Sequence, residues 1–148
     1  MDSQAHRWYQ EYGPGIYRFA LSILRDPQLA EDVLQETFLR LLSRGIIPDP
    51  GKERPWLYKV ARNLCYDHLR KRRREPSAPI SPPPDENWEF ILLLESLPET
   101  ERQILALRFI GGFTHKEIAG ILGLTVHGAK KRYERAIRKL RKELEGLP

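Results

Sequence analysis

A proline-rich segment near the middle of the chain limits the folds that the sequence can form. The stretch EPSAPISPPP, residues 75–84, holds five of the 12 prolines of the chain. Proline lacks a backbone donor and fixes one backbone dihedral, so neither a helix nor a central strand can pass through this stretch. We expect an extended tether here. The tether divides the 148-residue chain into two halves that can each build only a small core.

Apolar residues on both sides of the tether recur with the period of an α-helix. Before the tether, three helices are expected, at residues 12–24, 26–44 and 54–74. Asp26 followed by Pro27 is a typical start for the second of them. After the tether, helices are expected at residues 86–97 and 98–110, and two more follow. No stretch alternates with a period of two over a useful length. The predicted fold is therefore all-α, with two small helical domains joined by a proline-rich linker.

The charge of the chain is unevenly distributed. The formal net charge is +5, and two basic blocks flank an acidic middle. Residues 59–74 hold seven Lys or Arg against one acid, and residues 118–148 hold eight against three. Residues 75–117 hold three Lys or Arg against eight acids. Concentrated basic blocks are typical of proteins that bind a polyanion such as nucleic acid.

The composition argues against several other classes of protein. Cys65 is the single cysteine, so no internal disulfide can form, and the four histidines show no metal-ligand spacing. We therefore expect no metal and no cofactor. No catalytic constellation is visible, which argues against an enzyme. The chain shows no apolar signal core and no apolar run as long as a membrane span, which predicts a cytoplasmic protein without membrane insertion.

Residues 113–126, FTHKEIAGILGLTV, carry the signals of two helices joined by a glycine turn. Thr114 and Glu117 form a capping box at the start of the first helix. Gly123 is expected to end that helix with a positive φ, and Thr125 to cap the next one. A short helix, a glycine turn and a longer helix form a helix-turn-helix motif, whose second helix enters the major groove of DNA.

The second helix of this motif has two chemically different sides. At about 100° per residue, its apolar side chains collect on one side: Val126, Ala129, Tyr133, Ala136, Ile137, Leu140 and Leu144. The other side is basic and polar: His127, Lys131, Glu134, Arg135, Arg138 and Lys142. A solvated basic face explains an isolated helix of this kind equally well, but the preceding turn favours DNA reading. Gly128 is unusual inside the first turns, because glycine costs about 1 kcal/mol relative to alanine in a helix.

The expected helix at residues 54–74 also has two sides. The apolar side holds Leu57, Val60, Ala61, Leu64, Cys65 and His68. The other holds Lys59, Arg62, Asn63, Tyr66, Arg70 and Arg73, with Trp56 at the border. Cations for phosphates, rings for stacking and an amide for a base edge are the groups that hold a single nucleic-acid strand. Alternatively, Trp56 and Tyr66 pack internally and the arginines are only solvated. Asn63 also has an alternative role, a buried hydrogen bond that orients the loop near Ile46 and Ile47.

The expected helix at residues 26–44 has an acidic outer side. The core side holds Leu29, Ala30, Val33, Leu34, Phe38, Leu41 and Leu42, and the opposite side holds Asp32, Gln35, Glu36, Leu39 and Ser43. An acidic side repels nucleic acid, and an exposed Leu39 at its centre indicates a protein partner. An acid–base or metal site at Asp32 and Glu36 is disfavoured, because no histidine, third carboxylate or phosphate loop supports it.

Taken together, these segments resemble a known family of transcription proteins. The segments LAEDVLQETFLRLL, PWLYKVARNLCYDHLRKRRR and SLPETERQILALRFIGGFTHKEIAGILGLTVHGAKKRYERAIRKL occur in the order found in extracytoplasmic-function (ECF, group IV) sigma factors of bacterial RNA polymerase. The resemblance implies a region 2 domain at residues 1–74, a linker at 75–86 and a region 4 domain at 87–148. It also implies binding to core RNA polymerase and promoter-specific initiation of transcription.

The resemblance assigns a role to each polar side. For docking on core polymerase it implies Asp32, Gln35, Glu36 and Leu39. For melting the minus-10 element and capturing a flipped base it implies Trp56, Lys59, Arg62, Asn63, Tyr66, Arg70 and Arg73. For reading the minus-35 element it implies His127, Lys130, Lys131, Arg132, Glu134, Arg135 and Arg138. This sequence departs from the family where a β-branched pair usually stands, at Gly128 and Ala129.

Two other readings of the sequence remain open. A stand-alone helix-turn-helix regulator would bind duplex DNA by itself, usually as a dimer on two half-sites, but it leaves the acidic side and the aromatic-basic helix unexplained. A nucleic-acid enzyme would need the catalytic groups that are not visible here. The expected partners are core RNA polymerase and promoter DNA, and an anti-sigma factor is a candidate third partner.

Overall fold

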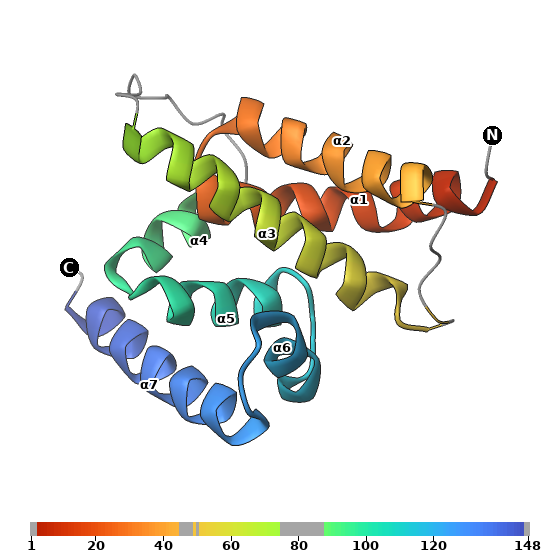
Figure 1. Ribbon diagram of the computed structural model, residues 1–148. Coiled ribbons are helices and arrows are strands. Elements are labelled where there is room, and N and C mark those ends of the chain that lie inside the picture. The colour runs from red at the N-terminus through yellow and green to blue at the C-terminus, as the bar shows by residue number, and fades with distance from the viewer. Residues whose placement is uncertain (1–2, 45–48, 50, 75–87, 147–148) are drawn as a thin grey trace. The chain divides into compact units, whose positions relative to one another are not determined.

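The computed structural model describes residues 3–44, 49, 51–74 and 88–146, and all regular structure within these ranges is helical. Figure 1 shows the elements in chain order, with bounds α1 (Ser3–Leu24), α2 (Pro27–Arg44), α3 (Glu53–Arg74), α4 (Trp88–Leu93), the 3-10 helix η1 (Leu94–Ser96), α5 (Glu99–Phe109), α6 (His115–Leu122) and α7 (Val126–Glu145). The predicted all-α class is confirmed. The proline-rich linker lies outside the described residues, so the domain limits at residues 74 and 87 stay predictions.

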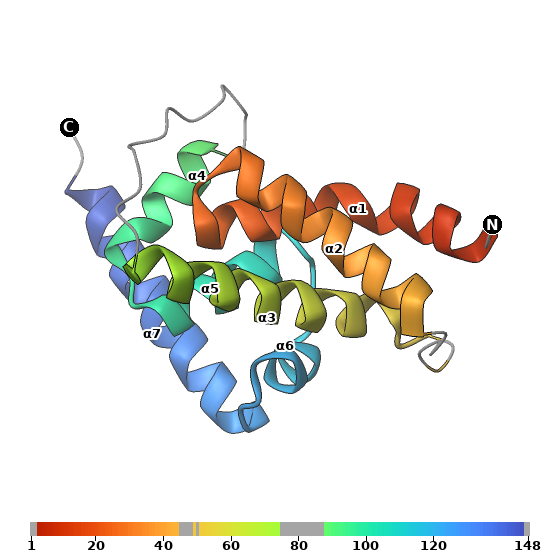
Figure 2. The same ribbon diagram turned by 45° about the horizontal axis from the view of Figure 1, so that its top comes forward.

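The chain divides into two compact units, of which the first holds α1, α2 and α3. Each of these three helices contacts the other two, and Figure 2 shows the same three helices from a second direction. Fully buried side chains come from all three helices: Ile16, Phe19, Ala20, Leu21, Ala30, Val33, Leu57, Ala61 and Cys65. Each helix therefore has one side in the core and the opposite side at the surface.

Helix α1 begins earlier than expected. The apolar periodicity predicted a helix at residues 12–24, but α1 begins at Ser3 and passes through Pro14. An interior proline loses one helical hydrogen bond and costs about 3 kcal/mol. The additional turns bury Ala5 and Trp8, which are 6% and 8% exposed. Burial of these two side chains offsets the cost of the proline, an effect that the local sequence signal does not contain.

Gly15 marks a close approach between α1 and α3. A Cβ at this position would overlap the hydroxyl of Tyr58, whose side chain is 2% exposed and packs against Phe19 with ring centroids 5.4 Å apart. Burial raises the pKa of the Tyr58 hydroxyl above its ordinary value, so this group stays neutral. The helix interior thus carries a glycine because the partner helix occupies the space of a side chain.

Helix α2 begins as predicted, but the prediction was wrong for one residue that was expected in its core. The Asp26 carboxylate accepts hydrogen bonds from the backbone of Gln28 at 3.0 Å and of Leu29 at 3.3 Å, which is an N-cap. Leu42 was expected in the core and is instead 52% exposed. It lies about 80° around the helix from Leu34, outside the sector that faces α1 and α3.

The second unit holds α4, η1, α5, α6 and α7. Its centre is formed by fully buried side chains of α5 and α6 and of the turn between them: Ile104, Leu105, Leu107, Phe113 and Ile118. The single helix expected at residues 86–97 is divided into α4 and η1. Pro98 follows Leu97, and a residue before proline disfavours the helical conformation, so the chain leaves the helix there.

None of the helices in the described ranges is both long enough and apolar enough to cross a membrane.

The contact between Gly15 and Tyr58 gives a stability prediction. Gly15→Ala forces the new methyl group against a buried hydroxyl and should destabilise the first unit by about 1 to 3 kcal/mol, as overpacking of a core does. Thermal unfolding of the full chain measures this. Gly13→Ala is the matched control on the same helix, because its Cβ would meet Leu34 Cδ1 at an ordinary 3.7 Å. The control should not lower the melting temperature, and Tyr58→Phe should restore part of the stability lost by Gly15→Ala. Equal melting temperatures for the two alanine variants would contradict this account.

Candidate docking and nucleic-acid faces

The docking face is the outer side of α2, formed by Asp32, Gln35, Glu36 and Leu39. The structure brings all four predicted residues together at the surface, and each is exposed. Leu39 is 58% exposed although it is large and apolar. The side-chain amide of Gln35 donates a hydrogen bond of 3.5 Å to Glu31, one turn earlier, which adds another carboxylate beside the face.

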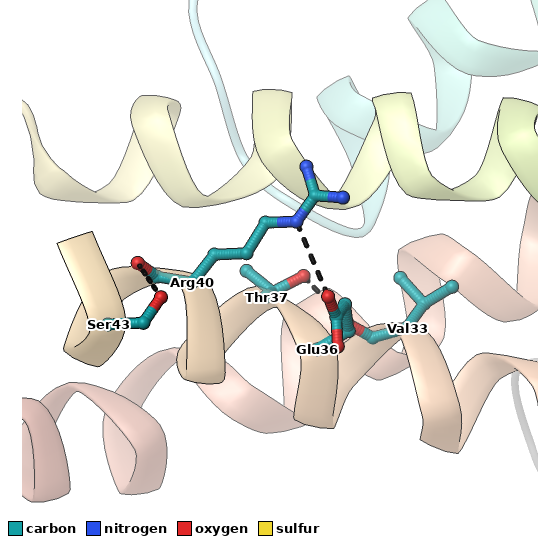
Figure 3. Close-up of polar contacts among 5 residues, drawn as sticks. All are labelled: Val33, Glu36, Thr37, Arg40 and Ser43. Carbon is teal, nitrogen blue, oxygen red and sulfur yellow. Dashed lines mark hydrogen bonds and ion pairs between the residues drawn. The ribbon is translucent and has the colours of Figure 1, made fainter.

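Glu36 has a weak partner on its own helix. The Arg40 Nε lies 3.5 Å from Glu36 Oε1, and the two side chains are 38% and 48% exposed (Figure 3). A pair this exposed contributes little to stability, because water screens it and two long side chains must be ordered. Thr37 in the same turn is buried, and its hydroxyl donates to the Val33 carbonyl at 2.7 Å. Glu36 can therefore exchange Arg40 for another cation without disturbing the core.

Leu42 extends the docking face with a second apolar side chain that the sequence analysis missed. Leu39 and Leu42 are one turn apart and are 58% and 52% exposed. Large apolar side chains that gather at the surface indicate a protein contact. The angle of about 60° between the two residues on a helical projection is the signal that would have placed Leu42 on this face.

The strand face is the outer side of α3, formed by Trp56, Lys59, Arg62, Asn63, Tyr66, Arg70 and Arg73. Lys59, Asn63 and Arg70 are exposed, and Trp56, Arg62 and Tyr66 are half-buried. The Arg62 guanidinium lies 4.6 Å from the centroid of the Tyr66 ring, so a cation already covers one side of this aromatic ring. Arg70 forms an ion pair with Asp67 on the same helix. The side chain of Arg73 lies outside the described part of the chain.

Asn63 lies at the middle of the strand face. Its side chain is exposed, which contradicts the alternative role of a buried hydrogen bond. The loop at Ile46 and Ile47, which was the expected partner in that alternative, lies outside the described residues. An exposed amide carries both donors and an acceptor and can match a base edge.

The helix-turn-helix of the second unit has the predicted caps. The Thr114 backbone donates to Glu117 Oε1 at 3.0 Å, and the Glu117 backbone donates to Thr114 Oγ1 at 3.2 Å. Gly123 ends α6 with a φ of 71°, in the left-handed region that favours glycine. The Gly128 backbone donates to Thr125 Oγ1 at 3.0 Å and so closes the start of α7. Local hydrogen bonds therefore fix where α7 begins.

The reading face is the outer side of α7, formed by His127, Lys130, Lys131, Glu134, Arg135 and Arg138, all of which are exposed. Ala129, Ala136 and Leu140 on the opposite side are buried, as predicted. Val126 and Leu144 were expected on that apolar side but are 45% and 52% exposed. They lie at the two ends of α7, where the helix extends past the side chains that cover its middle. One helical side therefore presents five basic or imidazole groups and one carboxylate.

Arg132, a predicted minus-35 residue, differs from its neighbours on α7. Its Nη1 lies 3.4 Å from Glu101 Oε1 on α5, and the two side chains are 41% and 8% exposed. Sequence projection on a single helix cannot detect this contact, because the partners are 31 residues apart. Arg132 therefore points toward α5 while the reading face points to solvent.

Two further groups limit the chemistry of the protein. Burial strongly raises the pKa of the Cys65 thiol, so this cysteine stays protonated and unreactive. Burial, with Arg108 and Lys130 nearby, lowers the pKa of His115, whose ring packs edge-on against Tyr133 at 4.9 Å. His115 is therefore neutral near pH 7 and packs as an aromatic side chain. No group of three potential metal ligands occurs within the part of the chain that the structure describes.

Comparison with known families matches each half of the chain to a described protein region. Residues 8–75 match the model of sigma-70 region 2, and residues 88–140 match that of sigma-70 region 4. Region 2 contains the docking and strand faces, and region 4 contains the reading face. A stand-alone helix-turn-helix regulator would leave the match to region 2 unexplained.

Similarity to individual relatives shows to which group within the sigma-70 family the chain belongs. The chain is 33% identical over 147 residues to the ECF RNA polymerase sigma factor SigM of Bacillus subtilis, covering 90% of each chain. It is 35% identical over 140 residues to the ECF sigma factor EcfG of Rhodopseudomonas palustris, covering 86% of this chain and 77% of the relative. The chain therefore belongs to the ECF sigma factors of the sigma-70 family, which direct RNA polymerase to promoters.

Solved structures show the same fold. The sigma factor RpoE of Bartonella quintana, in complex with the anti-sigma factor NepR, superposes with a TM-score of 0.78 at 25% identity and covers 96% of this chain and 99% of that chain. CnrH, in complex with the cytosolic domain of CnrY, gives a TM-score of 0.77 at 24% identity and covers 97% and 89%. Sigma factors are initiation factors and are not known as enzymes.

Proposed function

We propose that this sigma factor divides promoter recognition among the three faces: α2 docks on core polymerase, α3 captures the opened minus-10 strand, and α7 reads the minus-35 duplex. Region 2 would occupy residues 1–74 and region 4 residues 87–148, joined by a linker at 75–86. Because core polymerase and promoter DNA are in the cytoplasm, the protein acts there. The observation that carries the proposal is the polarity of α7, whose basic side is exposed while its alanine side is buried.

The reading face supplies two kinds of contact. Lys131, Glu134 and Arg135 lie in the first turns of α7, the part of a recognition helix that reaches base edges. Arginine or lysine pairs with guanine, and glutamate accepts from the cytosine amino group. Arg138 and Lys142 lie further along the helix, where phosphates of the backbone come within reach. Specificity and affinity are thus assigned to different parts of one helix.

The docking face and the strand face differ in charge and therefore in partner. The docking face combines carboxylates with the exposed Leu39 and Leu42, which suits a basic helical surface that also offers an apolar contact. The strand face combines cations with Tyr66 and the Asn63 amide, which suits phosphates and an unstacked base. The docking face and the strand face therefore differ in charge and in side-chain chemistry, although both belong to one three-helix unit.

An anti-sigma factor is a further partner for this chain. The solved structure of the Bartonella quintana relative contains the anti-sigma factor NepR. This chain covers 99% of that relative at a TM-score of 0.78, so it has the same folded elements available for such a contact.

The central test of the whole proposal is whether the purified protein co-elutes with core polymerase and gives initiation that depends on promoter sequence. A protein that binds duplex DNA alone and does not bind core polymerase would overturn it.

Arg135 and Lys142 should have different effects on promoter use. Arg135→Ala removes a base contact worth about 1 to 3 kcal/mol, and the ranking of minus-35 sequences should change. Lys142→Ala removes a phosphate contact, so all promoters should weaken alike and the salt dependence should fall by about one unit of slope. Initiation on a library of minus-35 sequences at several salt concentrations measures both. Uniform losses across the library for both variants would disprove the assignment.

Reversal of one charge on the docking face should separate binding from folding. Glu36 is exposed and points away from the core, so Glu36→Lys should keep normal helix content. Its affinity for core polymerase should fall by about tenfold or more, because a like charge then faces a basic partner. Arg40→Ala is the matched control: it removes the internal partner of Glu36 and should leave affinity equal or higher. Normal affinity in Glu36→Lys would mean that this face is only solvated.

Loss of the Asn63 amide should impair promoter opening. A flipped base costs a few kcal/mol of unpairing and unstacking, which contacts to the opened strand must offset. Asn63→Ala should keep its melting temperature and polymerase affinity and lose initiation on duplex promoters. A template already mismatched across the minus-10 element should restore part of the activity. Gln28→Ala removes another exposed amide and should change nothing. Normal initiation on duplex DNA, or a lowered melting temperature as the main defect, would remove Asn63 from the strand face.

A further inference from the structure

Glu101 and Arg132 form a charge contact between α5 and the reading helix, in which the carboxylate is buried and the guanidinium side chain is half-exposed. The Glu101 side chain is 8% exposed, and Arg132 Nη1 approaches it at 3.4 Å. Glu101 also lies in the first turn of α5, where the helix dipole favours a negative charge. A carboxylate this buried is unfavourable without a cation. The two side chains are therefore bound to each other more strictly than exposed pairs such as Glu36 and Arg40.

The buried positions of α7 on either side of Arg132 are alanines, while Leu140 and the ring of Tyr133 pack beside them. Ala129 and Ala136, which lie three residues before and four residues after Arg132, are 0% and 1% exposed. Alanine lets two helices approach closely, but its single methyl group interlocks little with the facing helix and resists rotation weakly. The guanidinium of Arg132 reaches past these alanines to a fixed carboxylate. Together with the packing of Leu140 and Tyr133, it therefore constrains the rotation of α7 about its own axis.

We propose that the Glu101–Arg132 ion pair positions the reading helix and thereby sets the minus-35 sequence selectivity of this sigma factor. The inference rests on the proposed role of α7 as the minus-35 reader. Arg132 is then a positioning residue that acts through its neighbours Lys131 and Arg135, and it is not itself a base-reading group.

Geometry explains why a small rotation matters. A helix with its side chains has a radius of about 5 to 6 Å, so a rotation of about 10° displaces surface atoms by about 1 Å. Hydrogen bonds to base edges weaken over displacements of that size. Phosphate contacts by long flexible lysines tolerate such a shift, since their attraction is not directional. Loss of the ion pair should therefore affect sequence discrimination more than total affinity.

The test replaces both partners, because removal of Arg132 alone leaves the buried Glu101 carboxylate unpaired, which can unfold the unit. Glu101→Leu/Arg132→Met keeps side chains of similar length and should retain the melting temperature, as apolar replacement of a buried ion pair often does. In complete holoenzyme, discrimination between the best minus-35 sequence and singly substituted ones should fall by about tenfold. The slope of affinity against salt should stay as in the unmodified protein, because the charge of Arg132 is already compensated by Glu101.

Arg138→Met is the matched control on the same helix. Arg138 is exposed, so this variant should lower the salt slope by about one and keep the ranking of minus-35 sequences. If the double variant has a lowered melting temperature, Arg132→Lys is used for the test instead. Lysine keeps the charge but lacks the planar fork of arginine. In this variant, discrimination between minus-35 sequences should fall by several-fold while the melting temperature stays normal.

Three results would overturn the inference. They are full discrimination in a folded double variant, full discrimination in Arg132→Lys, or a salt slope that falls in the double variant as it does in Arg138→Met. The last result would make Arg132 a phosphate contact. Failure of the underlying proposal looks different: in that case Arg135→Ala also leaves the ranking of minus-35 sequences unchanged, and α7 is not the reader.

Discussion

Burial of one side of each helix in a small core is the constraint on which the rest of this structure depends. In the first unit, fully buried side chains come from α1, α2 and α3 alike, and no helix is enclosed on all sides. In a core of this size every helix is also a surface helix, so its outer side is available for binding without loss of packing. The three binding faces follow from this arrangement. Each face lies on a helix whose opposite side is already fixed by the core, which holds its side chains in place before a partner arrives.

In the proposed function, the sign of the charge separates the partners of the neighbouring helices α2 and α3. α2 presents Asp32 and Glu36, whereas α3 presents Lys59, Arg62 and Arg70, although both helices belong to one unit and contact each other. An acidic face repels the DNA backbone, and a basic face repels a basic protein surface. Specificity therefore comes as much from the wrong partner being excluded as from the right one being attracted. The exposed Leu39 and Leu42 add an apolar contact to the acidic face, so its partner must match it in shape as well as in charge.

Features that depend on residues close together in the sequence could be predicted. Features that depend on contacts between residues far apart in the sequence could not. The caps at Asp26, Thr114 and Thr125 and the left-handed Gly123 are local hydrogen-bonding and steric effects, and the structure confirms them. The early start of α1 follows from burial of Trp8 against the rest of the first unit, which outweighs the local cost of Pro14 inside the helix. The exposure of Leu42 depends on the angle at which α2 meets its neighbours. The pairing of Arg132 with Glu101 joins residues 31 positions apart, so a projection of α7 alone cannot reveal it; the family resemblance assigned this arginine to the minus-35 element. The roles of the individual side chains in binding stay predictions.

The start of α7 has little room for larger side chains. A Cβ on Gly128 would lie 2.9 Å from Thr125 Oγ1, the atom that accepts the capping hydrogen bond from the Gly128 backbone. A larger residue at 128 would displace the threonine and weaken a cap worth about 1 kcal/mol. Ala129 is fully buried, so the position next to Gly128 also has no room for a larger side chain. Apart from His127, the first turn of α7 thus offers few side-chain atoms to a base pair. Under the proposed function, discrimination then depends mainly on the longer side chains that follow, Lys131, Glu134 and Arg135. A small rotation of α7 displaces the ends of these long side chains, so their selectivity depends on how firmly the helix itself is held.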